Sequence, residues 1–479
     1  MTSRRTFLRA AASAAALLGL SSRSAPALTR DAATNTPRKN ARNVIFMVAD
    51  GMNTASLCAA RHYQKRILGR DNTWLSLYTE RPAVRCAMET SSASGIVTDS
   101  SAASSSWGCG QRINNGTLNI HPEDGRKLAT LFAKVRPQGF LTALVTTATA
   151  THATPAGFVA QTPLRNDEAG IARQYFDNRV DIVLGGGQKF FNTKLRDAFK
   201  AAGYALALDR AALLAAPQPA APLLGLFANA HLPFTIDRDN SDALKQAVPT
   251  LAEMATAALT RLDALVAKRG APGFVLQIEA ARVDHAGHAN DAATLIHDLL
   301  AFDETIAAVL RYVDTHPDTL LVVTTDHGCG GLNTNGIGGN YEKSSQAFDR
   351  LAGFKASYSE LTTGARKVKS ADLGDYLLKH TGLKLTGDAL RGTAYALNAV
   401  RNYSADTMKG EQAALAKKGL GRLQDILGTK TGVGWTSGQH TGDLVELAAL
   451  GNGASRFTPF LRNDQVHNLL LQALGLPTA

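Results

Sequence analysis

The chain has 479 residues, 45% hydrophobic and 19% charged, which is enough for one large α/β domain or for two to three ordinary domains. Its net charge is +11, but four arginines and no acid lie in the first 27 residues, so the remaining 47 basic and 40 acidic residues give only +7. This modest excess, without a long basic run, excludes an obvious nucleic-acid groove. We expect no nucleic-acid partner, only a mild attraction for anionic substrates.

The N-terminus has the pattern of a twin-arginine export signal. Arg4 and Arg5 precede an apolar stretch from Ala10 to Leu20, and Ala25-Pro26-Ala27 offers a small-x-small cleavage site. The stretch is too short for a stable membrane span. The alternative is a basic, disordered N-terminus. We predict a signal peptide over residues 1–27, cleavage after Ala27, a flexible leader over residues 28–41, and a folded protein exported to the bacterial periplasm or medium with no stable membrane anchor.

The first predicted strand ends in an acid, and a serine-rich helix follows. Residues 43–50 (NVIFMVAD) are apolar up to Asp50, and residues 54–66 are predicted to be helical. A polar turn containing Asp99 and Ser100 then leads into a small-residue helix that reaches Trp107. A hydroxyl at a helix N-terminus lies in positive potential, which favours an anionic form and an anionic ligand. The alternative is an ordinary N-cap at Asp99.

The next predicted strand, residues 140–146, is followed by residues 146–155 (TTATATHATP) and by Arg165. A threonine hydroxyl can join a magnesium site, and the planar guanidinium of arginine can bind two oxygens of a phosphate. A short strand is predicted at 180–184, and residues 203–235 are predicted to form a strand, a short helix and a loop.

Metal-ligand side chains are densest after the predicted strand at 274–278. Glu279, Asp284 and His288 arrive within ten residues. Because an unpaired buried carboxylate is costly, these groups are expected to meet a cation or a hydrogen-bond donor. Asp with His suits zinc, and Glu among oxygen ligands suits magnesium. Helices are predicted before this segment, at 251–268, and after it, at 292–314.

The last buried strand expected from the sequence is Thr319–Asp326, which leads into His327. Residues 328–439 differ in composition, with 15 basic and nine acidic residues and predicted helices at 371–380, 388–402 and 409–427. We interpret them as an insertion on the main sheet within one catalytic domain, residues 42–479. His440 follows the insertion; a lone histidine of this kind is more often structural than a ligand.

Alternating strands and helices predict a mostly parallel sheet that is covered on both faces. Ligands of such sheets collect beyond the carboxyl ends of the strands, where Asp50, Glu279 and Asp326 are placed. Each acid alone could be a helix cap or a turn residue. Together with the neighbouring histidines they favour a metal site.

Cysteine usage excludes a disulfide scaffold, because the chain has only Cys58, Cys86, Cys109 and Cys329. No CxxC pair is present, so a thiolate zinc site is not favoured. The sequence is compatible with one disulfide or with four reduced thiols, and no pairing is assigned.

These motifs resemble the bacterial and animal alkaline phosphatases from about Asn43 to Leu474. The motifs that agree in order and spacing are Ala49-Asp50-Gly51-Met52, Thr98-Asp99-Ser100 with Trp107, His152-Ala153-Thr154-Pro155 with Arg165, Glu279 to His288, Asp326-His327-Gly328 and His440-Thr441-Gly442. The resemblance implies a three-layer α/β/α sandwich and a phosphate monoesterase that forms a phosphoserine.

The resemblance also implies roles for the site residues. One zinc ion is expected on Asp284, His288 and His440, and a second on Asp50, Asp326 and His327. A magnesium ion is expected on Asp50, Thr154 and Glu279. Ser100 is the expected nucleophile, Arg165 the expected phosphate clamp, and Asp99 the residue that orients Arg165.

Family members differ at two further positions, where some carry Asp and Lys and others carry two histidines. This chain has His152 and His285 there. We expect both to tune the magnesium site and its water rather than to bind zinc; His285 as a plain surface histidine is the alternative. The insertion is expected to shape the site entrance or an oligomer contact, and homodimers are common in the family.

The motifs leave two rival kinds of function. A related phosphodiesterase or sulfatase would share the metal cage, but the sulfatase pattern of Cys or Ser followed by x-Pro-x-Arg is absent after Ser100, and a diesterase would less naturally keep Arg165. A periplasmic phosphate-binding or metal-storage protein would have no use for a serine beside the metals.

Overall fold

The computed structural model describes residues 40–215, 220–397 and 405–478. The predicted signal peptide (1–27) and nearly all of the predicted leader (28–41) lie outside the described residues, so both stay predictions. In the described part of the chain, no helix is long and apolar enough to cross a membrane.

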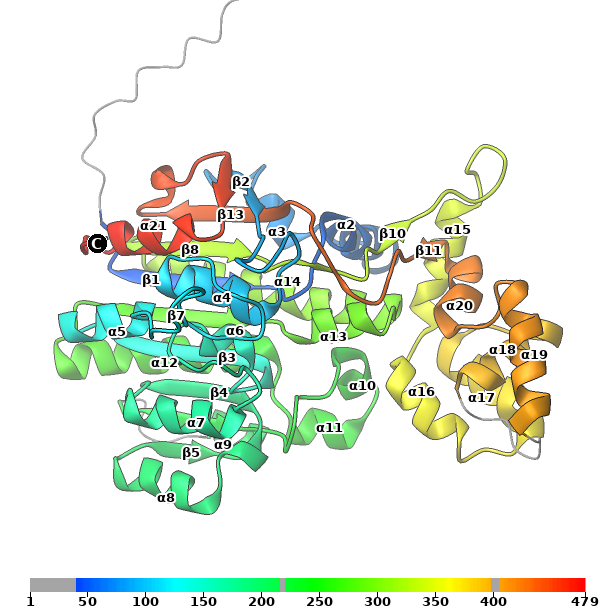
Figure 1. The fold of residues 1–479 in the computed structure, drawn as a ribbon, viewed down its shortest axis with the longest axis horizontal. Helices are drawn as coiled ribbons and strands as arrows, with labels where there is room; N and C mark the ends of the chain where they lie inside the picture. The colour runs from blue at the N-terminus through cyan, green and yellow to red at the C-terminus, as the bar shows by residue number, and fades with distance from the viewer. Residues whose placement is uncertain (1–39, 216–219, 398–404, 479) are drawn as a thin grey trace, which may run out of the picture. The chain divides into compact units, whose positions relative to one another are not determined.

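Ten strands form one sheet, and Figure 1 shows the labelled strands following one another across it. Only β13 runs antiparallel to its neighbours, β2 and β8. The prediction of a mostly parallel sheet is therefore confirmed. In sheet order the strands are β14 (Phe460–Arg462), β2 (Val84–Glu89), β13 (Val445–Gly451), β8 (Thr319–Thr324), β1 (Asn43–Val48), β7 (Phe274–Glu279), β3 (Leu141–Thr149), β4 (Ile182–Gly186), β6 (Leu223–Leu226) and β5 (Ala205–Ala207).

The sheet separates two apolar cores because successive side chains of a strand point to opposite faces. In β1, Ile45 and Met47 join one core, whereas Val44, Phe46 and Val48 join the other. The first face carries α2 (Thr54–Tyr63), α3 (Thr73–Ser76), α9 (Arg210–Leu214), α10 (Thr235–Asp239), α11 (Asp242–Ala247), α12 (Leu251–Arg269), α13 (Arg282–His288) and α14 (Ala292–Thr315). The second carries α4 (Ser100–Cys109), α5 (Leu131–Val135), α6 (Ala153–Ala156), α7 (Glu168–Asp177), α8 (Thr193–Ala201) and α21 (Gln465–Ala473). The arrangement is the expected three-layer sandwich.

Four strands of the sheet were not predicted: β2, β13, β14 and one of β5 and β6, because a single strand was expected over residues 203–235. The expectation that Thr319–Asp326 is the last clear buried strand is wrong. Strand β13 follows it in the chain and lies between β8 and β2. A charged residue, Glu446, interrupts its apolar pattern, and Arg85 interrupts that of β2. The two neutralise each other across the strands, with Arg85 Nε 2.9 Å from Glu446 Oε2.

The segment between His327 and His440 is mainly helical, and its helices gather to one side of the sheet in Figure 1. They are α15 (Ser344–Asp349), α16 (Tyr358–Ala365), α17 (Leu373–Thr381), α18 (Gly387–Ala396), α19 (Ala405–Lys417) and α20 (Leu423–Thr431). The single helix predicted at 409–427 is wrong, because the chain breaks after Lys417, where Gly419 has a φ of +71°. Residues 398–402 of the helix predicted at 388–402 lie outside the described part.

Specific contacts tie this segment to the sheet-bearing part of the chain. Arg66, just beyond α2, pairs with Asp349 at 2.7 Å. The N–H of Tyr358 donates to the carboxylate of Asp291, which caps α14, at 2.7 Å. The segment leaves and returns through two short antiparallel pairs, β9 (Gly328–Cys329) with β12 (His440–Thr441) and β10 (Asn333–Thr334) with β11 (Val433–Gly434).

Candidate active site

The site begins where three central parallel strands end together. Strand β1 lies between β7 and β8, and its last residue, Val48, is in register with both Glu279 and Thr324. Asp50, Glu279 and Asp326 therefore meet at one edge of the sheet, and all three are 0% exposed. The sheet topology thus produces the cluster of acids that the sequence predicted.

Asp50, Asp326 and His327 form a fully buried set, here called the strand-end group. His327 Nε2 lies 3.0 Å from Asp326 Oδ2 and 3.7 Å from Asp50 Oδ1. The other oxygen of Asp326 accepts the backbone N–H groups of Gly51 and His327 at 3.0 and 2.9 Å. Asp326 is therefore both a turn residue and a potential ligand.

Asp284, His288 and His440 form a second set, the helix-side group, contributed by α13 and β12. His288 Nε2 and His440 Nε2 lie 3.3 and 3.5 Å from the two oxygens of Asp284 and 3.1 Å from each other. The Nδ1 atoms of His288 and His440 each donate 2.8 Å hydrogen bonds, to the carbonyls of Gly438 and Thr98. Because these hydrogen bonds place a proton on Nδ1 of each ring, the lone pair of each Nε2 is available to bind a cation.

Gly51 lets the two groups approach each other. Its φ is +76°, and a Cβ at this position would lie 2.7 Å from Cα, Cβ and Oδ1 of Asp284. Any larger residue would push Asp284 away from the turn that carries Asp50.

A third set, the inner group, consists of Asp50, Thr154 and Glu279 with His152 alongside. Thr154 Oγ1 lies 3.4 Å from Asp50 Oδ2, and His152 Nδ1 lies 3.0 Å from Glu279 Oε1. The hydroxyl of Thr146, on β3, donates to Glu279 Oε2 at 2.5 Å. His152 offers a nitrogen within reach of both carboxylates, since its Nδ1 is 3.8 Å from Asp50 Oδ2.

Three buried carboxylate oxygens in these groups lack a hydrogen-bond partner among the described residues: Asp50 Oδ1, Asp284 Oδ1 and Asp326 Oδ2. A buried carboxylate oxygen without a donor is costly. Three sets of ligand atoms lie within 4.8 Å of one another: those of Asp284, His288, Cys329 and His440, those of Asp50, His152 and Glu279, and those of Asp50, Asp284 and His327. Such carboxylate and imidazole donors are typical ligands of divalent cations. The residues present therefore fit bound cations.

The electrostatics agree with this interpretation. Burial, followed by the charges of Asp326, Asp284 and Glu279, raises the pKa of Asp50. A hydrogen bond with Asp284 raises the pKa of His288 to about 9. Without cations the site would therefore hold extra protons on these side chains, and divalent ions are the natural replacement for them.

Ser100 lies beside the strand-end group at the start of α4. It is 2% exposed, and its Oγ is 3.3 Å from His327 Nε2. Asp99 caps the same helix by accepting the N–H of Ala102 at 2.9 Å, and its other oxygen accepts from Arg165 Nη1, also at 2.9 Å. The N-cap considered for Asp99 and the Arg165 partner implied by the resemblance are both present. Burial opposes ionisation of Asp99, but the charge of Arg165 and these hydrogen bonds lower its pKa.

Sequence reasoning missed His231 and Cys329, and it did not settle His285. The ring of His285 lies 4.5 Å from that of His231 and 5.8 Å from that of His152, and its Nδ1 accepts from Arg282. Burial lowers the pKa of His231 to about 3 and that of His285 to about 2, so both rings are neutral. The plain surface histidine considered for position 285 does not fit these contacts. His231 comes from a loop with no sequence signal for the site.

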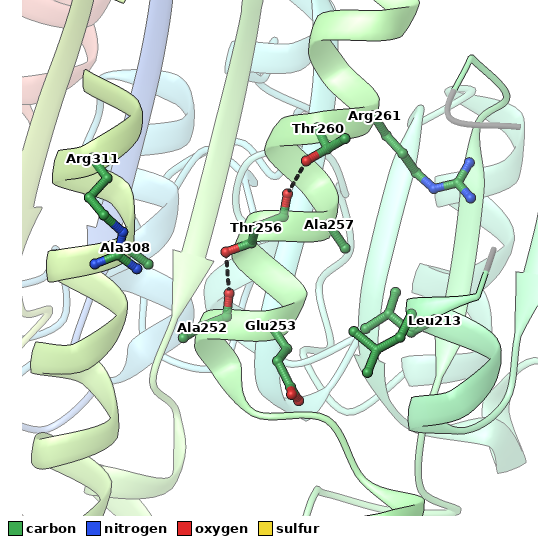
Figure 2. A pocket seen from close by; sticks show the side chains of 10 residues that line it. Leu213, Ala252, Glu253, Thr256, Ala257, Thr260, Arg261, Ala308 and Arg311 are labelled. Atoms are coloured by element: carbon green, nitrogen blue, oxygen red, sulfur yellow. Dashed lines mark hydrogen bonds between the residues drawn. The ribbon is translucent and has the colours of Figure 1, made fainter. Parts of the chain in front are cut away.

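A pocket elsewhere on the molecule lacks such chemistry. It measures about 460 Å³ and lies against α9, α12 and α14 (Figure 2). The hydroxyls of Thr256 and Thr260 donate to carbonyls of their own helix, and Glu253 belongs to the capping box of α12. These groups are occupied by structural hydrogen bonds.

Comparisons with known proteins identify the family. The family model "Alkaline phosphatase" matches residues 41–476. Alkaline phosphatase 4 of Bacillus subtilis (strain 168) is 29% identical over 443 residues, which cover 90% of this chain and 88% of that protein. Streptomycin-6-phosphate phosphatase of Streptomyces griseus is 33% identical over 346 residues, which cover 60% of this chain and 74% of that protein.

Solved structures extend the likeness to the fold. The crystal structure of Thermus thermophilus alkaline phosphatase superposes with a TM-score of 0.79 at 34% identity and covers 92% of each chain. The cold-active alkaline phosphatase of a Shewanella species gives a TM-score of 0.75 at 29% identity, covering 90% of this chain and 99% of that one. The chain belongs to the alkaline phosphatase family and is a phosphoester hydrolase.

Proposed function

We propose that the enzyme hydrolyses phosphate monoesters to inorganic phosphate and an alcohol through a phosphoserine at Ser100, at a centre of two zinc ions and one magnesium ion. One observation carries the proposal: a buried serine hydroxyl lies 3.3 Å from His327, beside buried carboxylate oxygens that have no partner among the described residues. A nucleophile and a cation cage in one place are what phosphoryl transfer requires.

The helix-side group would hold one zinc ion and the strand-end group the other. The inner group would hold magnesium through Asp50, Thr154 and Glu279. Asp and His donors suit zinc, and an oxygen-rich set suits magnesium. When bound, the three cations lower the pKa of the serine hydroxyl and of water and neutralise the transferring phosphoryl group.

Ser100 makes the new bond to phosphorus. Its Oγ attacks phosphorus and its proton passes to solvent. The leaving group departs with the electrons of the broken P–O bond and takes a proton from solvent to become the alcohol. Water then attacks the phosphoserine and releases phosphate and Ser100. Because Ser100 opens α4, the unpaired N–H groups of the helix N-terminus favour both the alkoxide and the bound anion.

Arg165 positions the phosphate and sets the preference for monoesters. Asp99 holds one arm of its guanidinium, and the rest of the planar fork can bind two non-bridging oxygens. A diester has one fewer non-bridging oxygen and one fewer negative charge, so the fork would stabilise it less. The energy of this contact should therefore grow with the charge of the transferring group.

His152 and His285 are proposed to tune the magnesium site. His152 contacts Glu279, and His285 lies against His152 and His231, so the three rings form a wall next to the inner group. His152 would hold Glu279, and the neutral rings of His231 and His285 would order water there without adding positive charge.

We further propose that the protein is exported by the twin-arginine pathway and cleaved after Ala27, because its N-terminal pattern is that of a twin-arginine signal peptide. The mature enzyme would then be periplasmic or secreted. We also propose that the 328–439 segment shapes the site entrance, because it begins and ends at the ligands His327 and His440. A homodimer is proposed by likeness to the family alone.

A substrate panel on zinc- and magnesium-loaded enzyme tests the proposed function. We expect release of 4-nitrophenol from 4-nitrophenyl phosphate at alkaline pH to exceed its release from bis(4-nitrophenyl) phosphate and from 4-nitrophenyl sulfate by several orders of magnitude. Trapping of radioactive phosphate on Ser100 at acid pH would support the covalent step. Faster turnover of the diester or the sulfate would instead favour the rival activities.

A further inference from the structure

The helix-side group contains a fourth donor atom. Ligand atoms of Asp284, His288, Cys329 and His440 all lie within 4.8 Å of one another. Cys329 is 0% exposed and is not part of a disulfide. A buried thiol among two imidazoles and a carboxylate is placed as a metal ligand would be.

Strand pairing fixes the thiol in this position. Cys329 in β9 is directly opposite His440 in the antiparallel partner β12. Directly opposed residues of an antiparallel pair project to the same face. The Cys329 side chain therefore points to the same side as the His440 imidazole, toward α13.

The surface of α13 leaves room for the sulfur. A Cβ added at Gly287 would lie 3.0 Å from Cβ and 3.1 Å from Sγ of Cys329, so only glycine lets the thiol lie this close to the helix. Gly287 directly precedes His288 in the chain. Gly330, with a φ of +72°, also lies close to α13, because a Cβ there would be 2.7 Å from the carbonyl oxygen of Gly287.

An independent observation points to a missing partner at the same place. Asp284 is 5% exposed, and its Oδ1 has no hydrogen-bond partner among the described residues. The thiol of Cys329 belongs to the same group of ligand atoms as this carboxylate. A cation between them would satisfy both.

We propose that Cys329 is a fourth protein ligand of the cation held by Asp284, His288 and His440. This inference rests on the metal centre proposed above. Sγ binds as a thiolate, and its proton passes to solvent. A soft sulfur donor selects zinc or cadmium over magnesium and manganese, so Cys329 would make this position specific for thiophilic metals.

Cobalt substitution provides the test on the whole metal-loaded enzyme. Cobalt bound to a thiolate shows a sulfur-to-metal charge-transfer band in the near ultraviolet. We expect this band in the wild type and in the triple variant Cys58→Ser, Cys86→Ser and Cys109→Ser, which leaves Cys329 as the remaining thiol. We expect its loss in Cys329→Ser. Absence of the band in the wild type or in the triple variant would overturn the proposal, even if Cys329→Ser failed to fold.

Metal affinity gives a second readout. Cys329→Ser should weaken cadmium and zinc binding at this position by at least about tenfold, the range seen when only an outer partner of a ligand is lost. The control Cys86→Ser, a buried thiol of β2, should leave both affinities unchanged. Equal affinities in Cys329→Ser and wild type would contradict the ligand. Failure of the wild type to bind cobalt at all would instead refute the metal centre itself.

Discussion

The strand-end group and the helix-side group use the same kinds of atoms but are held differently. Asp50, Asp326 and His327 follow neighbouring central strands and are 0% exposed. His288 and His440 come from a short helix and a short strand, and their side chains are 37% and 15% exposed. The sheet thus fixes one group within the core, whereas the other closes only after the chain returns from the 328–439 segment. We infer that the helix-side cation exchanges more easily with solvent.

The largest expected effect comes from the residue beside the strand-end group. Ser100→Ala should lower the turnover of 4-nitrophenyl phosphate by roughly four to six orders of magnitude, as removal of a nucleophile does in other hydrolases. The zinc and magnesium content should be unchanged, because Ser100 is not one of the carboxylate residues proposed to bind the cations. Near-normal turnover in this variant would remove Ser100 from the mechanism. Ser106→Ala removes a buried hydroxyl of the same helix that donates to the carbonyl of Ala102, and it serves as the control.

Matched substitutions in the two groups test the difference between them. In Asp326→Asn the remaining oxygen can still accept the N–H groups of Gly51 and His327, so the turn should persist while one zinc ion is lost. We expect at least about a thousandfold loss of kcat that added zinc does not restore, as for other losses of charge stabilisation. His288→Gln should bind zinc more weakly but recover activity at high zinc. Zinc titrations of both variants measure this; identical behaviour would contradict the comparison.

Arg165→Ala should give the next largest effect. Removing a preorganised donor to the transferring group costs about 10²–10³ in rate. The loss should be greater for the monoester than for the diester, because the dianionic monoester presents more negative charge to the fork than the monoanionic diester. Measurements of kcat/KM for both substrates test this difference. The control Arg173→Ala removes an exposed ion pair with Asp177 on α7 and should leave both kcat/KM values unchanged. Equal losses on the two substrates in Arg165→Ala would exclude the clamp.

The smallest effect concerns Asp298, a buried acid on α14 outside the cage. Burial raises its pKa to about 7, above the value of about 3.9 in an unfolded chain. Its contribution to stability is therefore fully present below about pH 4 and is lost as the pH rises toward 7. Asp298→Asn should abolish this loss and gain on the order of 2 kcal/mol over the wild type near pH 8.

Urea unfolding of the metal-free enzymes across pH 4–8 measures the Asp298 effect. Keeping both proteins in chelator separates it from the pH dependence of metal binding. If the free energy of unfolding changes with pH in the same way in the wild type and in Asp298→Asn, the pKa of this carboxyl is not raised and the prediction is wrong.

Sequence reasoning reached the strand-end acids because a buried parallel strand that ends in Asp or Glu has a simple geometric meaning. It failed where distant segments decide a residue's surroundings. Cys329 meets the helix-side group only through the pairing of β9 with β12, and His231 meets His285 from a loop. Strands β2 and β13 were missed because Arg85 and Glu446 neutralise each other only across the sheet. The break after Lys417 depends on a positive φ at Gly419, which a window of helix-forming residues conceals.

Diffraction recorded on both sides of the zinc absorption edge, from crystals grown with zinc and magnesium, tests the central claim most directly. The account predicts two anomalous peaks, one among Asp50, Asp326 and His327 and one among Asp284, His288 and His440. A third, non-anomalous ion should lie at Glu279 and Thr154. Density maps without metal at these carboxylates, from enzyme that still cleaves phosphate monoesters, would contradict it.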